Sequence, residues 1–296
     1  MSHSISDQAL DRLLRLGRPL ADETPAEAAS LGFEEKYRVV REVGRGGLGT
    51  VYEAVDRWLG RRVAIKVLTA GGAADFELRQ RFEHEARAAT RLTHPNIARV
   101  LEIHSRYIVM QFIAGETLAT ADRSAPERLV RWVREAALAV HYAHQQGLVH
   151  RDLKPQNLMV ASATDGLYVM DFGLALRLDS RAGGADWGRV LGTPAYMSPE
   201  QARGRVDEVG PRSDVYSLGA TLYELLSNRR PFDGESSAAV LEQVVHAEPV
   251  PLATRAPLLD PRLGAIAMRC LAKDPAGRPP SAYALAHELA DWLGRA

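Results

Sequence analysis

Hydrophobic residues change their spacing near residue 115, and the change divides the chain into a strand-like and a helix-like part. Before that point the apolar residues stand in short runs. The runs at 62–68, 98–103 and 106–112 have the length of β-strands, and only two residues separate the last two runs. Beyond residue 115 the apolar positions recur mainly at helical spacing. The pattern therefore predicts an α+β protein whose strands come first and whose helices follow.

Two long helices are predicted from the same pattern. Residues 76–92, within the strand-like part, carry one apolar stripe, and Pro95 stops this helix because proline cannot continue it. Residues 124–146 form the second helix, and Ser124 and Glu127 have the spacing of a capping box at its start.

Residues 1–36 are expected to be an extension in front of the folded part. Leucines and alanines at 9–16 predict a short amphipathic helix, which Gly17 and Pro19 stop. Residues 21–30 are small, acidic and rich in alanine, which is typical of a linker. An idle tail is the preferred interpretation, and docking of the short helix on the domain or on a partner is the alternative.

The composition excludes several classes of protein. Lys+Arg and Asp+Glu both number 37, so no net field favours nucleic acid or an anionic membrane. No apolar run approaches the roughly 20 residues that cross a bilayer, and the N-terminus lacks the apolar core of a secretory signal. The single cysteine, Cys270, rules out an internal disulfide. We expect a cytoplasmic protein.

The strongest chemical signal lies at residues 150–157, where Asp152, Lys154 and Asn157 stand within one short turn. A second carboxylate, Asp171, follows an apolar run and comes just before a glycine. Mg-dependent phosphoryl transfer requires one carboxylate that orients a hydroxyl, and a carboxamide and a further carboxylate as hard oxygen ligands. The residue types in this pattern therefore point to that chemistry.

Glycines at positions 44, 46 and 49 lie between two strand-like segments. A dinucleotide-binding fingerprint is disfavoured, because it needs a helix directly after the glycines. A hairpin tip without side chains lets backbone N–H groups approach phosphates, although a merely flexible hairpin explains the glycines equally well.

Lys66 stands in an apolar strand, where it shares a face with Ala64 and Leu68. A lysine among apolar neighbours needs a partner, and Glu85 on the predicted helix is the preferred one, with Glu83 as its competitor. A lysine at a sheet edge whose amine reaches water is the simpler alternative.

Two histidines, His141 and His144, are spaced to share one face of a helix. Nothing in the sequence adds a further His, Cys or carboxylate that would complete a metal site with them. A metal site at these histidines is therefore not expected.

Taken in order, these motifs resemble those of the eukaryotic-like protein kinases. The matching elements are the glycine pattern from Gly44 to Val51, Val63-Ala64-Ile65-Lys66, Glu85, His150-Arg151-Asp152 with Asn157, Asp171-Phe172-Gly173 and Ser198-Pro199-Glu200. The run from Gly192 to Gln201 resembles, more narrowly, the bacterial serine/threonine kinases. The resemblance covers residues 37–293. It implies a two-lobed kinase fold, with a small β-rich lobe at 37–113 that holds one main helix and a larger helical lobe at 114–296.

The resemblance gives the catalytic residues their roles. Asp152 would orient the substrate hydroxyl and accept its proton. Lys154 would balance charge on the transferring γ-phosphoryl group, and Thr193 would contact both Asp152 and Lys154. Lys66 would hold the α- and β-phosphates and pair with Glu85.

The resemblance also implies ATP and Mg²⁺ as cofactors, with Asn157 and Asp171 as the metal ligands. Met110 matches the gatekeeper, and Gln111 and Ile113 would offer backbone groups to adenine. The residues expected around ATP are Gly44, Gly46, Gly47, Gly49, Val51, Ala64, Lys66, Met110, Gln111, Ile113 and Met159.

Other matching residues are expected to be structural. His150 and Phe172 would belong to the packed spine that holds the site together. Asp214 would bind the backbone of the catalytic turn from below. Glu200 would pair with Arg278 in a buried ion pair.

The segment between Asp171 and Glu200 departs from the family pattern. Kinases with an arginine before the catalytic aspartate usually neutralise that arginine with a phosphorylated hydroxyl. Thr193, Tyr196 and Ser198 belong to the element at 192–200 that would position the protein substrate, which leaves Ser180 as the only other hydroxyl in this segment. We expect fixed charge from Asp179 or Asp186 to replace a strong phospho-switch. Phosphorylation of Ser180 is the alternative.

The resemblance implies an enzyme that phosphorylates serine and threonine hydroxyls of proteins in bacterial signalling. A catalytically silent binding module is one alternative, but such chains typically lack a residue of the machinery and this chain retains all of it. A small-molecule phosphotransferase is disfavoured by the intact element at 192–200, and tyrosine specificity by Lys154 and Thr193. A transient dimer for autophosphorylation is expected as a further partner state, and nucleic acid is not.

Overall fold

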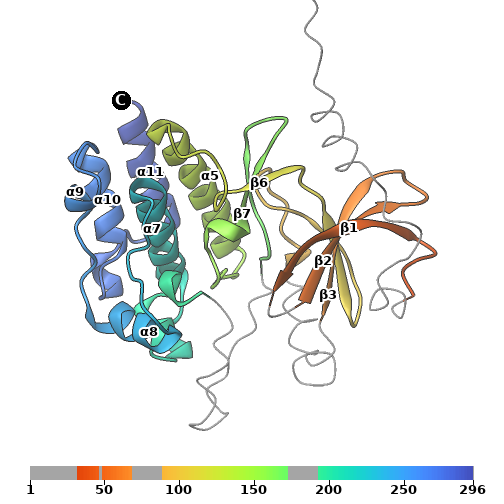
Figure 1. The fold of residues 1–296 in the computed structure, drawn as a ribbon, viewed down its shortest axis with the longest axis horizontal. Helices are drawn as coiled ribbons and strands as arrows, with labels where there is room; N and C mark the ends of the chain where they lie inside the picture. Colours follow the sequence, from red (N-terminus) through yellow and green to blue (C-terminus); the bar gives the residue numbers. More distant parts are fainter. Residues whose placement is uncertain (1–31, 47–48, 69–88, 173–192, 296) are drawn as a thin grey trace, which may run out of the picture.

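The computed structural model describes residues 32–46, 49–68, 89–172 and 193–295. A twisted sheet and a group of helices lie side by side in it, with a small second sheet between them (Figure 1). This arrangement confirms the α+β class. Most of the helix predicted at 76–92 lies outside the described residues.

The larger sheet contains five antiparallel strands in the order β1-β2-β3-β5-β4. Their bounds are β1 Tyr37–Gly46, β2 Gly49–Asp56, β3 Arg62–Leu68, β4 Val100–Ile103 and β5 Tyr107–Gln111. The short turn predicted between the last two strands is present, because His104 N–H donates to Tyr107 O at 2.9 Å.

Strand β3 lies in the middle of this sheet, so both of its edges are paired, and buried residues lie on both of its faces. Val63, Ile65 and Val67 pack into one cluster with Tyr52 and Val109. Ala64 packs on the opposite face, and the alternation of side chains places Lys66 on that face too. The prediction that Lys66 shares a face with Ala64 agrees with this strand. The alternative of an edge lysine is wrong, because β3 pairs on both sides and Lys66 is 7% exposed.

The small sheet has the order β6-β7-β8, with bounds β6 Gly115–Thr117, β7 Leu158–Ala161 and β8 Leu167–Val169. It brings the two ends of the candidate catalytic segment together, since β7 follows residue 157 and β8 leads to residue 171. Gly115 is required at the β6–β7 contact, because a Cβ atom there would lie 1.8 Å from Val160 O.

The helical part is built around α5 Pro126–Gln145 and α7 Pro211–Ser227, which pack against each other and share one apolar core. The other helices and helical turns are η1 Pro155–Asn157, η3 Pro194–Tyr196, α6 Pro199–Ala202, η4 Val206–Glu208, α8 Ser237–His246, α9 Leu252–Arg255, α10 Pro261–Cys270, η5 Pro275–Gly277 and α11 Ala282–Leu293. Helices α7 and α10 approach closely at Gly219, where a Cβ atom would meet the Cβ of Cys270 at 2.2 Å.

The capping box predicted at the start of α5 is wrong. The helix begins at Pro126, its N-cap is Ala125, and no side chain caps it. Ser124 lies one residue before the N-cap, and its hydroxyl donates to Asp122 Oδ2 at 2.8 Å instead. Proline at the first helical position leaves one backbone donor fewer to satisfy, which lowers the need for a cap.

The boundary expected between residues 113 and 114 falls in the segment that joins β5 to β6 (Figure 1). The division of the chain into 1–36, 37–113 and 114–296 stays a prediction. No helix in the described part of the chain is long and apolar enough to cross a membrane.

Candidate active site

The segment at 150–157 crosses from the helical part to the small sheet and contains a strained residue. Arg151 has a φ of 68°, in the left-handed region that costs a residue with a side chain of order 1 kcal/mol. Such a conformation persists only where its surroundings hold it. Asp214 on α7 supplies that support, since its Oδ2 accepts from the N–H of His150 and its Oδ1 from the N–H of Arg151, both at 2.8 Å.

His150 links this segment to the one that carries Asp171. The imidazole Nε2 lies 2.8 Å from Met170 O, and the ring meets Phe172 edge-on at 4.7 Å between centroids. Both rings are buried. The packing role expected of His150 and Phe172 fits this position.

Asp152, Lys154 and Asn157 form one compact cluster. Lys154 Nζ lies 2.8 Å from Asp152 Oδ2 and 3.0 Å from Oδ1. Asn157 Nδ2 donates to Asp152 O at 2.7 Å and to Oδ2 at 3.0 Å. The carboxylate of Asp152 is therefore fixed from two sides, while a third of its side-chain surface stays exposed at 34%. A carboxylate that is held in place and still accessible can accept a proton.

Asp171 contacts Lys66 across the gap between the two sheets. Lys66 Nζ lies 2.9 Å from Asp171 Oδ2, and the lysine side chain is only 9% exposed. Burial acts to raise the pKa of Asp171, but the charge and the hydrogen bond of Lys66 outweigh it, so the pKa lies below its ordinary value. Asp171 is thus an anion at neutral pH. The predicted partner of Lys66, Glu85, lies outside the described residues.

The chemistry of Asn157 and Asp171 fits a divalent cation. Both N–H bonds of the Asn157 amide are turned toward Asp152, which leaves its Oδ1 without a hydrogen-bond partner in the described part of the chain. An amide oxygen and an ionised carboxylate are the ligand types that Mg²⁺ takes from proteins. No cluster of three or more His, Cys, Asp or Glu side chains suited to a metal occurs among the residues the structure describes.

The glycine segment is the hairpin between β1 and β2. Gly44 pairs with Val51 and Gly46 with Gly49, and a strand follows the glycines directly. The dinucleotide fingerprint is therefore excluded at this position. Gly47 lies outside the described residues.

Three of the residues expected around adenine lie on the face of the sheet that carries Lys66. Ala64 and Met110 are buried there in one cluster, against which Val51 packs. Gln111 N–H donates a hydrogen bond to Arg99 O at 2.8 Å, whereas Ile113 N–H donates no hydrogen bond among the described residues. Met159 is half-buried on β7, and its place beside adenine stays a prediction. Within the described ranges, the Ile113 N–H is thus an unused donor of the kind that a purine base needs.

Thr193 is the N-cap of η3, and its side chain makes no cap hydrogen bond. It also donates no hydrogen bond to Asp152 or Lys154 in the part of the chain that the structure describes. Its contact with those residues stays a prediction. Ser180, the expected phosphorylation site, lies outside the described residues.

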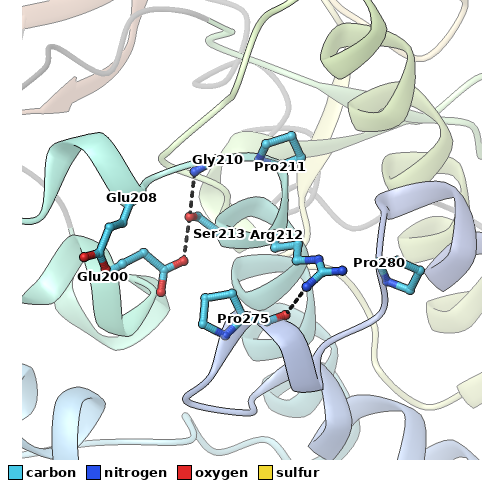
Figure 2. Close-up of a pocket in the computed structure, with 8 residues that line it drawn as sticks. All are labelled: Glu200, Glu208, Gly210, Pro211, Arg212, Ser213, Pro275 and Pro280. Atoms are coloured by element: carbon cyan, nitrogen blue, oxygen red, sulfur yellow. Dashed lines mark hydrogen bonds between the residues drawn. The ribbon is translucent and has the colours of Figure 1, made fainter.

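Glu200 and Arg278 form a buried bidentate ion pair, in which Arg278 Nη1 lies 2.8 Å from Glu200 Oε1 and Arg278 Nη2 lies 2.9 Å from Glu200 Oε2. Ser213 donates to the same Oε1 at 2.6 Å. Burial acts to raise the pKa of Glu200, and the bonds from Arg278 and Ser213 bring it below its ordinary value. A surface pocket of about 330 Å³ lies beside this network, with Glu200, Arg212 and Ser213 among its lining residues (Figure 2).

One residue of the site was missed from sequence. His144 on α5 places its Nε2 2.8 Å from Asp214 Oδ2, so Asp214 receives a third hydrogen bond. The histidine spacing identified a shared face with His141 but not this partner, which lies 70 residues along the chain.

Comparisons with known proteins agree with this geometry. Residues 37–290 match the protein kinase domain family. The serine/threonine-protein kinase PknB of Mycobacterium tuberculosis is 39% identical over 270 residues, which cover 87% of this chain and 43% of that protein. The serine/threonine-protein kinase pkn2 of Myxococcus xanthus is 39% identical over 280 residues, covering 90% of this chain and 33% of that protein. The chain thus spans less than half the length of these relatives.

A solved structure extends the comparison to the fold. The crystal structure of the Mycobacterium tuberculosis PknI kinase domain aligns with a TM-score of 0.69 and 29% identity, over 92% of this chain and 99% of that one. The expected two-lobed fold is confirmed, with a β-rich small lobe and a helical large lobe. The chain therefore belongs to the protein kinase family, in its bacterial serine/threonine group.

Proposed function

We propose that this chain transfers the γ-phosphoryl group of ATP to serine and threonine hydroxyls of proteins. The observation that carries the proposal is the fixed cluster of Asp152, Lys154 and Asn157 beside the Lys66–Asp171 ion pair. These five side chains supply a proton acceptor, two cations and two oxygen ligands, which together are the parts that phosphoryl transfer needs.

The chain's own residues perform separate tasks in the reaction. Asp152 accepts the proton as the substrate oxygen bonds to the γ-phosphorus and the bond from that phosphorus to the bridging oxygen breaks. Lys154 balances negative charge at the transferring group, and Lys66 binds the phosphates that remain on the nucleotide. Asn157 and Asp171 would hold Mg²⁺, which when bound neutralises charge on the phosphate oxygens.

The experiment is transfer of label from γ-labelled ATP to a generic basic protein in the presence of Mg²⁺. We expect label on serine and threonine with the wild type and at least a hundredfold less with Asp152→Asn or Asp171→Asn. Asp207→Asn, the same chemical change at an exposed position, serves as the matched control and keeps wild-type activity. Replacement of Mg²⁺ by a chelator should abolish labelling.

Two outcomes would contradict the proposal. Binding of ATP without transfer by any of the proteins would favour the silent binding module. Transfer to small molecules alone, with none to protein, would favour the small-molecule phosphotransferase.

We further propose that a phosphorylated Ser180 is not required for activity, and that Asp179 or Asp186 supplies negative charge to Arg151. Phosphosite mapping of the active protein, with Ser180→Ala as the variant, tests this. Stoichiometric phosphate on Ser180 together with loss of activity in the variant would contradict it. We place the reaction in the cytoplasm, where ATP is supplied, and include a transient dimer for autophosphorylation in the proposal.

A further inference from the structure

Gln201 joins two segments of the candidate site that lie 50 residues apart in the chain. It lies in α6, the short helix that ends the substrate-positioning stretch at 193–202. Its amide Nε2 donates to the backbone oxygen of Arg151 at 2.8 Å. Its amide Oε1 accepts from Ser198, at 3.1 Å from the backbone N and 3.0 Å from Oγ. One side chain therefore bonds both segments at once.

The peptide group that Gln201 holds is the one directly before Asp152. The oxygen of this peptide is Arg151 O, and its N–H belongs to Asp152 and donates to His150 Nδ1 at 3.3 Å. Both ends of the peptide are thus held by side chains. Rotation about the N–Cα bond of Asp152 would turn its carboxylate away, and the two hydrogen bonds to this peptide oppose that rotation.

We propose that Gln201 is a positioning residue, which fixes the peptide before Asp152 and ties it to the segment that positions the protein substrate. This inference rests on the proposed kinase function, since Asp152 is the proton acceptor there. Asp214 accepts a hydrogen bond from Arg151 N–H, and Gln201 donates one to Arg151 O, so both peptide groups of the strained residue are held. The substrate segment and the proton acceptor then keep one fixed distance.

A simpler role would be capping of α6 alone. Gln201 and Ser198 form a capping box, in which the Gln201 side chain contributes only an acceptor oxygen. Glutamate fills that position equally well. The Nε2–H bond to Arg151 O is therefore the part of the geometry that needs glutamine, and it can be removed while the cap is kept.

Gln201→Glu and Gln201→Met separate the two roles in steady-state phosphorylation of the basic protein by Mg-ATP. Glu keeps the cap, loses the donor and adds a charge, whereas Met loses both cap and donor without a charge. We expect both variants to lower kcat about tenfold, because a displaced Asp152 accepts the proton less well, and to leave KM for ATP unchanged. Gln201→Glu should keep the wild-type melting temperature within a few degrees.

Gln243→Glu is the matched control. Gln243 Nε2 also donates to a backbone oxygen, Asp233 O, at 2.8 Å, but in α8 and away from Asp152. We expect it to keep the wild-type kcat.

Each other pattern of kcat values among the variants overturns the inference. A fall in kcat with Met alone would mean that Gln201 only caps α6, and a fall with Glu alone would mean that charge near Asp152 is the cause. Equal loss in Gln243→Glu would show a general effect of such substitutions. If the wild type itself fails to transfer label while it binds ATP, the proposed function fails and not this inference.

Discussion

Lys66 Nζ lies 2.9 Å from Asp171 Oδ2, and this ion pair joins the central strand of the large sheet to the segment after β8. The two residues are 105 positions apart in the chain. The lysine that would bind phosphate and the carboxylate that would bind metal thus neutralise each other in this state. A nucleotide and its metal would supply opposite charges to both groups, so binding can replace the pair without leaving either charge bare.

Lys66→Met removes the cation of this pair. We expect phosphoryl transfer to fall about a hundredfold or more, because the cation that would bind the nucleotide phosphates is lost. We also expect the pKa of Asp171 to rise, because the largest effect that opposes burial is removed. Labelling with γ-labelled ATP measures the first effect. Lys36→Met, which removes an N-lobe lysine paired with Glu102, is the control. Equal activity in Lys66→Met and wild type would refute the role of the pair.

The sequence predicts each half of this ion pair but not the contact itself. Alternation along 62–68 placed Lys66 on a face with Ala64, and an apolar run followed by Asp171 predicted a functional turn. The contact depends on how β3 and β8 approach each other, which is a tertiary relation between segments with no shared periodicity. For the same reason the motifs located Asp214 and Glu200, while His144 escaped notice as a partner of Asp214.

Asp214→Asn should weaken both stability and activity. Asp214 is fully buried and accepts hydrogen bonds from two backbone N–H groups and from His144. An amide leaves at least one of these donors facing an NH₂ group, at a cost of about 3 kcal/mol in the free energy of unfolding. Urea unfolding and kcat measure the two effects. Asp260→Asn makes the same change at an N-cap distant from the site and should leave kcat unaltered.

Glu200→Gln should destabilise the helical lobe by about 3–5 kcal/mol, because it leaves the Arg278 guanidinium buried without a counter-charge. The double variant Glu200→Gln with Arg278→Met should lose less than the sum of the two single variants, as measured by urea unfolding. Strict additivity would mean that the pair is not energetically coupled. Since the pKa of Glu200 is below its ordinary value, the wild type should keep this contribution above about pH 4 and lose it as the pH falls further.

Cys270 should react with thiol reagents only when the protein unfolds. It is fully buried against Gly219, and burial raises the pKa of its thiol to about 12. At pH 8 the folded protein shields the Cys270 sulfur from the reagent and keeps its thiol protonated. We expect the labelling rate to equal the unfolding rate, while the exposed Ser162→Cys variant is labelled at once. Rapid labelling of Cys270 in the native protein would show that α7 and α10 separate readily.

Lys273 follows α10 in the chain, and its side chain reaches the C-terminal end of α8. Its Nζ donates to Val244 O at 2.7 Å and lies 4.2 Å from the centre of the Phe232 ring. Burial, only partly offset by Glu248, lowers the pKa of Lys273 from 10.5 to about 8. The folded state therefore disfavours the charged amine that the unfolded chain carries.

The lowered pKa of Lys273 predicts that the protein gains stability at alkaline pH. Below pH 8 both states are protonated and the full penalty for the charge is present. Between about pH 8 and pH 10 the unfolded chain binds more protons than the folded one, so the free energy of unfolding rises with pH. Lys273→Arg keeps a fixed charge and lacks this gain. Urea unfolding at pH 7.5, 8.5 and 9.5 should show the wild type gaining about 1 kcal/mol over Lys273→Arg, after allowance for solvent screening. A difference between the two proteins that stays constant across this range would mean that Lys273 remains charged in the folded state.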